Sequence, residues 1–229
     1  MKVFFDTNIF SASRSYEKII STKKIHWGDI EFKNEEQSYQ RKIAENPEHQ
    51  ALLYIGAYGR SGAFSAHITR SIKLEMLPQS RFARDTEADA LRGIGVQTHP
   101  DIIELSCFRS FTLIDDLMKI KPAMTEAIGI IKDMNDSDIS VAFSMINAGC
   151  TYEDFLNRIG AVKKIAAIFD RKHWPDAFHY VSAEHNGADF FLTCDQKFLN
   201  FVRNTAEYKS PCIALSPTQL LQNLNIATH

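Results

Sequence analysis

Three aspartates stand at places where the chain pattern predicts that a strand or helix begins or ends. Asp6 follows the apolar run "KVFF", Asp195 follows the apolar run "DFFLTC", and Asp176 opens the helical pattern "WPDAFHYVSAEH". In an open parallel sheet, the carboxyl ends of the strands share one edge, and active sites form just outside it. The spacing therefore predicts that the three carboxylates gather at the same edge of a sheet.

Such a group of carboxylates has both a structural and a chemical explanation. An aspartate after a strand is often only the N-cap of the next helix, but Ser, Thr and Asn also cap well, so capping does not require aspartate three times. Like charges about 4 Å apart repel by roughly 4 kcal/mol at an effective dielectric constant of about 20. A cluster of them needs a cation or raised pKa values. Oxygen ligands without Cys or His favour Mg²⁺ or Mn²⁺, and either ion could activate water for attack on a phosphodiester.

The elements that would position these aspartates alternate between strands and helices. Helix signals include Pro175 in a first turn, Gly187 as a stop, Ser71 as a cap, and Ser216 with Pro217 at the start of the last helix. The alternation predicts an α/β protein, a three-layer α/β/α sandwich around a mainly parallel sheet. The segments read as strands are "KVFF", "AHITRS", "DFFLT" and "PCIAL", and those read as helices are "HQALLYIGAYGR", "IKLEML", "PDAFHYVSAEH", "DQKFLNFVRN" and "PTQLLQNL".

Two other regions are less regular. Residues 22–48 are polar and are interpreted as a solvent-facing excursion, whereas 96–170 read as mostly helical, with turns at "KPAM", "NDSD" and "NAGC". We therefore expect a single domain over residues 1–229, with insertions at about 20–48 and 96–170. The helical region could cover a cleft, form a dimer surface or do neither, and the sequence leaves this open.

The composition is that of an ordinary globular protein. The 229 residues are 45% hydrophobic and 24% charged, with a formal net charge of −2, so any nucleic-acid site must be local rather than a consequence of bulk charge. Four scattered cysteines without a C-x-x-C pair argue against a zinc site or a disulfide scaffold. No apolar run of about 18 residues and no signal-peptide pattern occur, so we expect a cytoplasmic protein without a membrane span.

The segments "VFFDTNIF", "PDAFHYVSAEHNGADFFLTCDQKF" and "IALSPTQLL" together resemble the PIN-domain nucleases, a superfamily that includes VapC-type ribonucleases. The resemblance covers roughly residues 1–12, 50–78 and 172–222. It implies that Asp6, Asp176, Asp195 and Glu75 from "ITRSIKLEML" bind Mg²⁺ or Mn²⁺, with Glu87 as the alternative to Glu75. The chain is longer than the compact PIN toxins, which indicates a distinct subgroup with its own substrate.

Residues around these acids receive lesser roles. Thr7, Asn8 and Thr193 could hydrogen-bond the ligating carboxylates and orient them, or they could be ordinary turn and cap residues. Asp189 begins its strand at the opposite end from Asp195 and is interpreted as structural. Three histidines are interpreted as packing or surface residues because helical spacing puts two of them on different faces; they are His173, His179 and His185. Basic residues expected near the edge could contact phosphates, or they could be solvated surface charges; those favoured are Arg70, Lys73 and Lys197.

Three functions are compatible with these residues. The resemblance favours a metal-dependent endoribonuclease, for which Asp6→Asn or Asp195→Asn should abolish cleavage and leave the fold intact. A phosphatase of the haloacid-dehalogenase type is disfavoured because it needs a second aspartate where this chain has Asn8. A catalytically silent PIN-like module that binds RNA or a protein is the third. An antitoxin-like partner, a toxin role and a homodimer stay open.

Overall fold

The computed structural model describes residues 1–14, 16–27, 30–41, 47–77, 90–108, 120–146, 149–205 and 207–226. A five-stranded sheet lies at the centre of the chain, with the order β5-β4-β1-β6-β7 and all neighbours parallel. Its strands are β1 (Lys2–Phe5), β4 (Ser65–Thr69), β5 (Val96–His99), β6 (Phe190–Leu192) and β7 (Ile213–Leu215). The predicted α/β class with a central parallel sheet is confirmed.

The first strand occupies the middle of this sheet. Phe4 pairs with His67 of β4 on one side and with Phe191 of β6 on the other. The strand order therefore reverses direction at β1, because the chain runs from β1 through β4 to β5 and then crosses to β6. Crevices at the carboxyl ends of the strands beside such a switch point are where open α/β sheets bind ligands.

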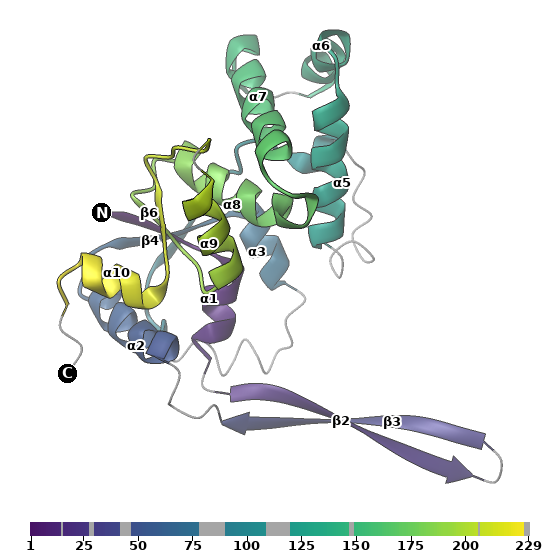
Figure 1. The fold of residues 1–229 in the computed structure, drawn as a ribbon, viewed down its shortest axis with the longest axis vertical. Coiled ribbons are helices and arrows are strands. Elements are labelled where there is room, and N and C mark those ends of the chain that lie inside the picture. Colours follow the sequence, from purple (N-terminus) through teal and green to yellow (C-terminus); the bar gives the residue numbers. More distant parts are fainter. Residues whose placement is uncertain are drawn as a thin grey trace.

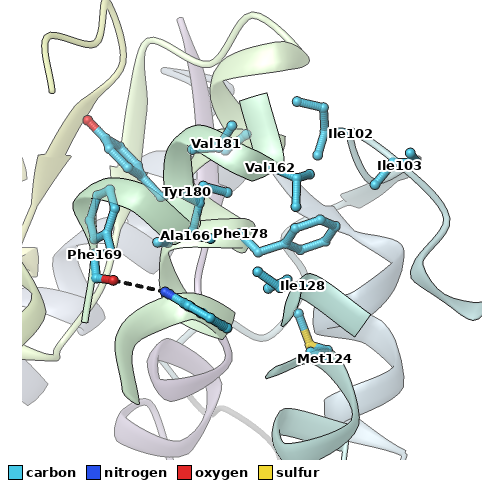
Figure 2. Packing of buried hydrophobic residues seen from close by; sticks show 14 of the residues in the cluster. Ile102, Ile103, Met124, Ile128, Val162, Ala166, Phe169, Phe178, Tyr180 and Val181 are labelled. Atoms are coloured by element: carbon cyan, nitrogen blue, oxygen red, sulfur yellow. Dashed lines mark hydrogen bonds between the residues drawn. The ribbon is translucent and has the colours of Figure 1, made fainter. Parts of the chain in front are cut away.

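One face of the sheet is covered by an apolar cluster that includes Phe4, Phe191 and Ala214. Alternate residues of a strand point to opposite faces, so Phe4 belongs to this cluster while Val3 and Phe5 belong to the other. The helices that contribute to it are α5 (Ile120–Asp133), α6 (Asp136–Met145), α7 (Tyr152–Ile168), α8 (Trp174–His185) and α9 (Gln196–Asn204). Figure 2 shows Met124, Ile128, Val162 and Phe178 packed together at its centre.

The opposite face carries a second apolar cluster, in which Leu192 and Leu215 of the sheet pack with Leu52, Ile55 and other buried side chains. Its helices are α1 (Thr7–Ala12), α2 (Pro47–Arg60), α3 (Arg70–Met76) and α10 (Pro217–Asn223). The sheet therefore has helices on both faces (Figure 1). The predicted caps at Ser216 and Gly187 are confirmed: Ser216 accepts a hydrogen bond from the Gln219 N–H, and Gly187 has a φ of 72° just after α8.

The helical region contains α5, α6 (Asp136–Met145) and α7, as predicted, and capping boxes open both α6 and α7. Three expectations nearby were wrong. Residues 96–99 form β5 of the sheet rather than a helix, and Lys121 and Pro122 of "KPAM" lie in the first turn of α5 rather than in a turn. Ser71 lies inside α3, whose N-cap is Thr69. Short 3₁₀ helices occur at Leu105–Cys107 and Arg171–His173.

The polar region near the N-terminus forms two long strands, β2 (Tyr16–Trp27) and β3 (Ile30–Arg41). They pair antiparallel as a sheet of their own, and this hairpin extends away from the rest of the molecule in Figure 1. The expected excursion is therefore a β-hairpin. Among the described helices, none has both the length and the apolar character needed to cross a membrane.

Candidate functional site

Asp6 is a buried carboxylate at the carboxyl end of the central strand. Only 3% of the residue is exposed, and it caps α1 by accepting a hydrogen bond from the Thr7 N–H to Oδ1 at 2.7 Å. Its second oxygen, Oδ2, accepts from Asn8 Nδ2 at 2.6 Å and from Thr193 Oγ1 at 2.7 Å. The hydrogen bonds predicted for Asn8 and Thr193 are therefore present, and they fix the orientation of this carboxylate.

The charge of Asp6 is costly in this position. Burial raises the pKa of Asp6, and the negative charge of Asp176 adds to that rise, whereas His179, Thr193 and Lys121 oppose it. The two carboxylates are therefore within electrostatic range of each other, whereas their sharing of a bound ion stays a prediction. A nearby cation would favour the ionised form of Asp6.

Glu75 of α3 is linked to Asp6 through Thr7, which hydrogen-bonds both carboxylates. Thr7, the residue after Asp6, donates a hydrogen bond from Oγ1 to Glu75 Oε2 at 2.7 Å. The other oxygen, Oε1, is 2.8 Å from Nε2 of His179 in α8, and neither side chain is appreciably exposed. Burial alone would raise the pKa of Glu75, but the charge and hydrogen bond of His179, with help from Lys121 and Thr7, lower it to about 2. Glu75 is thus an ionised carboxylate held from two sides.

His179 connects this carboxylate to a second buried acid. Burial disfavours the charged imidazole, but Glu75, Asp6 and Asp101 more than compensate, so the pKa of His179 is raised. Its Nδ1 lies 3.0 Å from Ser71 Oγ, and Ser71 Oγ donates to Asp101 Oδ1 at 2.5 Å. A protonated imidazole donates from both nitrogens, so the chain of contacts from Glu75 to Asp101 is fully paired.

Asp176 lies in the first turn of α8, and its side chain is 14% exposed. Its Oδ1 accepts a hydrogen bond from Lys121 Nζ of α5 at 2.7 Å. Burial would lower the pKa of Lys121, but Asp176, Glu75 and Asp6 together raise it. The lysine is therefore held in its charged form by three carboxylates, of which Asp176 is the one it contacts.

Asp195 is placed differently from the other three acids. Its Oδ1 accepts hydrogen bonds from the backbone N–H groups of Lys197 and Phe198, which is an N-cap of α9. Its own N–H donates to Thr193 Oγ1 at 3.1 Å, and that hydroxyl also donates to Asp6. Asp195 is therefore linked to Asp6 through the hydroxyl of Thr193. The described contacts of its own carboxylate are those of a helix cap.

The basic residues favoured for phosphate contact lie on the surface. Arg70 is 3.9 Å from Glu104, both side chains being well exposed, and Lys73 and Lys197 are exposed as well. Arg70 and Lys73 belong to the same helix as Glu75, and Lys197 follows Asp195 by two residues. The alternative acid Glu87 lies outside the described residues. Asp189 accepts a hydrogen bond from the Lys2 N–H at the opposite end of the sheet, as expected for a structural role.

The donor chemistry around Asp6, Glu75 and Asp176 suits Mg²⁺ or Mn²⁺, because the acidic side chains that meet there offer carboxylate oxygens. In the described ranges, however, no three Asp, Glu, His or Cys side chains are arranged as a ready-made metal-binding group. The repulsion between the acids is relieved within the protein itself by two cations, Lys121 and His179. The predicted need for a cation or raised pKa values is therefore met without a divalent ion, by these two side chains and by the raised pKa of Asp6.

Sequence reasoning missed three residues of this site: His179, Lys121 and Asp101. His179 carried a usable signal, since it lies three positions after Asp176 on the same face of a helix. Its spacing to His185, by contrast, places the two histidines on different helix faces and gives no such signal. Lys121 and Asp101 carry no comparable signal, because their partners are 55 and 30 positions away in the chain.

No protein-family model matches this chain, and no significant match to a curated protein or to a solved structure was found.

Proposed function

We propose that this protein is a metal-dependent nuclease of the PIN-like type, and specifically an endoribonuclease that hydrolyses phosphodiester bonds. The observation that carries the proposal is the buried Asp6 at the carboxyl end of β1, where strand order reverses, with Glu75 linked to it through Thr7 and with Asp176 within electrostatic range. Ion pairing for stability alone would not require three acids from three separate elements at this edge. Asp195, at the end of the next strand, completes the proposed set.

Different residues of the chain would have different roles in such a site. Asp6, Glu75 and Asp176 would hold Mg²⁺ or Mn²⁺, with Asp195 as a more distant contributor. Thr7, Asn8 and Thr193 keep the carboxylates in fixed orientations through the hydrogen bonds described above. When bound, the ion supplies Lewis-acid activation of water and neutralises charge on the phosphate. Asp176, whose side chain is 14% exposed, would accept a proton from water.

The proposed substrate is RNA. Because the formal net charge of the protein is −2, a local group of basic residues rather than the overall charge would attract the RNA backbone. Arg70, Lys73 and Lys197 are exposed cations close in sequence to Glu75 or Asp195, and we assign them to phosphate contacts along the strand. A cytoplasmic location, an antitoxin-like partner and a homodimer belong to the same proposal.

Purified protein incubated with mixed RNAs and DNAs, with Mn²⁺ or with a chelator, tests the function. We expect Mn²⁺-dependent cleavage of RNA that the chelator abolishes. Asp176→Asn should remove most of the cleavage, whereas Asp189→Asn, a matched change at the opposite edge of the sheet, should leave it unchanged. Equal cleavage by wild type and Asp176→Asn would refute the assignment of the site.

A second function is favoured by one specific observation, the compensation of the acids by Lys121 and His179. A centre that is already neutralised can serve as a structural element of a catalytically silent module that binds RNA or a protein. Calorimetry with Mn²⁺ separates the two functions: a nuclease should bind the ion in a way that depends on Asp6 and Asp176. A silent module should show no heat that depends on these carboxylates.

A further inference from the structure

Exposed cations from two separate segments meet at the aromatic ring of Trp174, at the beginning of α8. The ammonium nitrogen of Lys132, in the last turn of α5, lies 5.9 Å from the centre of this ring, and the guanidinium carbon of Arg171 also lies 5.9 Å from it. The two cationic centres are therefore at most twice that distance apart. Lys172 follows Arg171 and is exposed as well. We call Lys132, Arg171 and Lys172 the Trp174 cation cluster.

The Trp174 ring that carries these cations is held in place by packing. Only 6% of Trp174 is exposed, and its Nε1 donates a hydrogen bond to the Phe169 carbonyl at 2.8 Å. The ring also lies against α5 at Gly129, where an added Cβ would be 3.8 Å from the ring carbon Cζ3. Lys132 is three residues after Gly129, so it belongs to the same face of α5. The ring is therefore a fixed platform between α5 and the segment that follows α7.

A purely structural role explains only part of this arrangement. A lysine in the last turn of a helix stabilises the helix dipole, and its alkyl chain can cover an aromatic ring. Neither effect requires further cations from a second segment at the same ring. Asp170 lies 3.8 Å from Lys172, but both side chains are well exposed and such a pair contributes little. Within the described ranges, neither Lys132 nor Arg171 forms an ion pair with a carboxylate, including the adjacent Asp133 and Asp170. The cluster therefore presents positive charge that the protein leaves unpaired.

The Trp174 cation cluster adjoins the edge of the sheet that carries the buried acids. Trp174 precedes Asp176 by two residues in the first turn of α8. Lys121, which contacts Asp176, and Lys132 are eleven residues apart in α5, which is about three helical turns. Both lysines therefore lie on the same face of α5, about 16 Å apart along its axis. A strand that follows this face would meet the cluster at one end and the acidic edge at the other.

We propose that the Trp174 cation cluster is a docking surface for the backbone of RNA, whose phosphates Lys132, Arg171 and Lys172 bind. Guanidinium and ammonium groups are the donors that phosphate oxygens prefer. A local basic surface is what a protein with a formal net charge of −2 needs to hold a polyanion. The helical region thereby receives a function, since α5 supplies Lys132. Binding does not depend on cleavage, whereas delivery of the strand to the acids rests on the proposed nuclease function.

The test measures the binding of a short, single-stranded, fluorescein-labelled RNA by fluorescence anisotropy in chelator. We expect the double variant Lys132→Gln/Lys172→Gln to bind about tenfold more weakly than wild type. The slope of log affinity against log salt should decrease by about 0.7 for each lost phosphate contact, or about 1.4 for the double variant. Lys132→Arg/Lys172→Arg keeps both charges and should bind as wild type does. Circular dichroism verifies that the variants fold.

Arg92→Gln/Lys209→Gln is the matched control, because it also removes two exposed positive charges. Each of these residues lies four residues before a strand, β5 or β7, and thus towards the opposite edge of the sheet. The control should leave the affinity and the salt slope unchanged.

The inference is overturned if Lys132→Gln/Lys172→Gln binds RNA as tightly as wild type or if the control weakens binding equally. It is also overturned if wild type binds vesicles of anionic lipid but not RNA. If only Lys132→Gln/Lys172→Gln weakens binding and wild type cleaves no RNA with Mn²⁺, the inference holds and the nuclease function fails. If wild type cleaves RNA and the double variant binds and cleaves it equally well, the nuclease function stands and the inference fails.

Discussion

The ends of β1 and β6 look alike in the sequence but differ in the folded protein. Both strands are short and apolar, both end near an aspartate, and both aspartates cap a following helix. Asp6 is buried, takes hydrogen bonds on both oxygens, and shares its surroundings with Glu75, Asp176 and two cations. Asp195 is partly exposed, and its described carboxylate contacts are two backbone N–H groups of α9.

The difference between the two strand ends shows that capping and chemistry are separable roles for the same residue type. A helix cap uses only one acceptor oxygen, so capping does not explain the contacts of the second carboxylate oxygen. At Asp6 the second oxygen is held by Asn8 and Thr193, which is the part of the arrangement that capping does not explain. Variants that change the two strand ends in the same way can therefore test which of them carries function.

The largest effect is expected from Asp6→Asn. Loss of a carboxylate that holds the proposed ion should remove several kcal/mol of transition-state stabilisation, which corresponds to about 10³-fold in cleavage rate. Asp195→Asn should cost no more than about tenfold. Cleavage assays with both variants, with circular dichroism to verify folding, measure this. Equal losses would show that the two strand ends have equivalent roles.

A smaller effect is expected from Thr193→Val, which keeps the shape of the side chain. The variant removes the hydroxyl that donates to Asp6 and accepts from Asn8, so Asp6 loses one of its fixed contacts. We expect the affinity for Mn²⁺ to fall by about 10–100-fold. Thr125→Val removes a hydroxyl that bonds only within α5 among the described contacts, and it should leave the affinity unchanged in calorimetry.

The pairing of Glu75 with His179 should appear in the pH dependence of stability. The pKa of Glu75 is lowered from 4.5 to about 2, so its contribution is present above about pH 4.5 and is lost as the pH falls towards 2. The pKa of His179 is raised from 6.5, so its contribution is present below that value and is lost as the pH rises through the raised pKa.

Urea unfolding of wild type and Glu75→Gln in chelator measures this contribution. The difference in the free energy of unfolding should be about 1–3 kcal/mol between pH 4.5 and 6 and should shrink towards pH 2. Asp6 has a raised pKa and acts in the opposite direction, but it is present in both proteins and largely cancels. A difference that does not depend on pH would contradict the pairing.

The smallest effect concerns Asp195 as a cap. Asp195→Ala should lower the free energy of unfolding by about 1 kcal/mol, and Asp195→Asn should change it by only a few tenths, because asparagine also caps. Ser216→Ala, at the equivalent cap of α10, should cost about as much as Asp195→Ala. A larger loss for Asp195 than for Ser216 in urea unfolding would show that Asp195 has contacts beyond capping.

Much of the fold could be predicted because local patterns determine it. The apolar runs of β1, β4, β6 and β7 and the caps at Ser216 and Gly187 are local signals, and these elements form where expected. Strand β5 was missed because "VQTH" is polar and lies at the edge of the sheet, where burial does not impose an alternating pattern. "KPAM" was misread because proline is also compatible with a first helical turn.

The site was predictable only in part, for a related reason. Asp6 follows a strand and Asp176 begins a helix, and each is marked in the sequence by that element; the electrostatic influence of Asp176 on Asp6 is in keeping with a common sheet edge. No comparable sequence pattern marks the neutralising cations. Lys121 contacts Asp176 because α5 packs against α8, and the two residues are far apart in the sequence. Sequence patterns predict which groups reach an edge, but not which charges accompany them.

One consequence concerns the edge strand β5 and the loop that follows it. Asp101 accepts hydrogen bonds from both the N–H and the hydroxyl of Ser71, at the beginning of α3. Glu75 lies four residues further along α3, on the same side of the helix as Ser71. Asp101 therefore helps to fix the rotation of α3 about its axis, so a peripheral loop contributes to the direction in which a central carboxylate points.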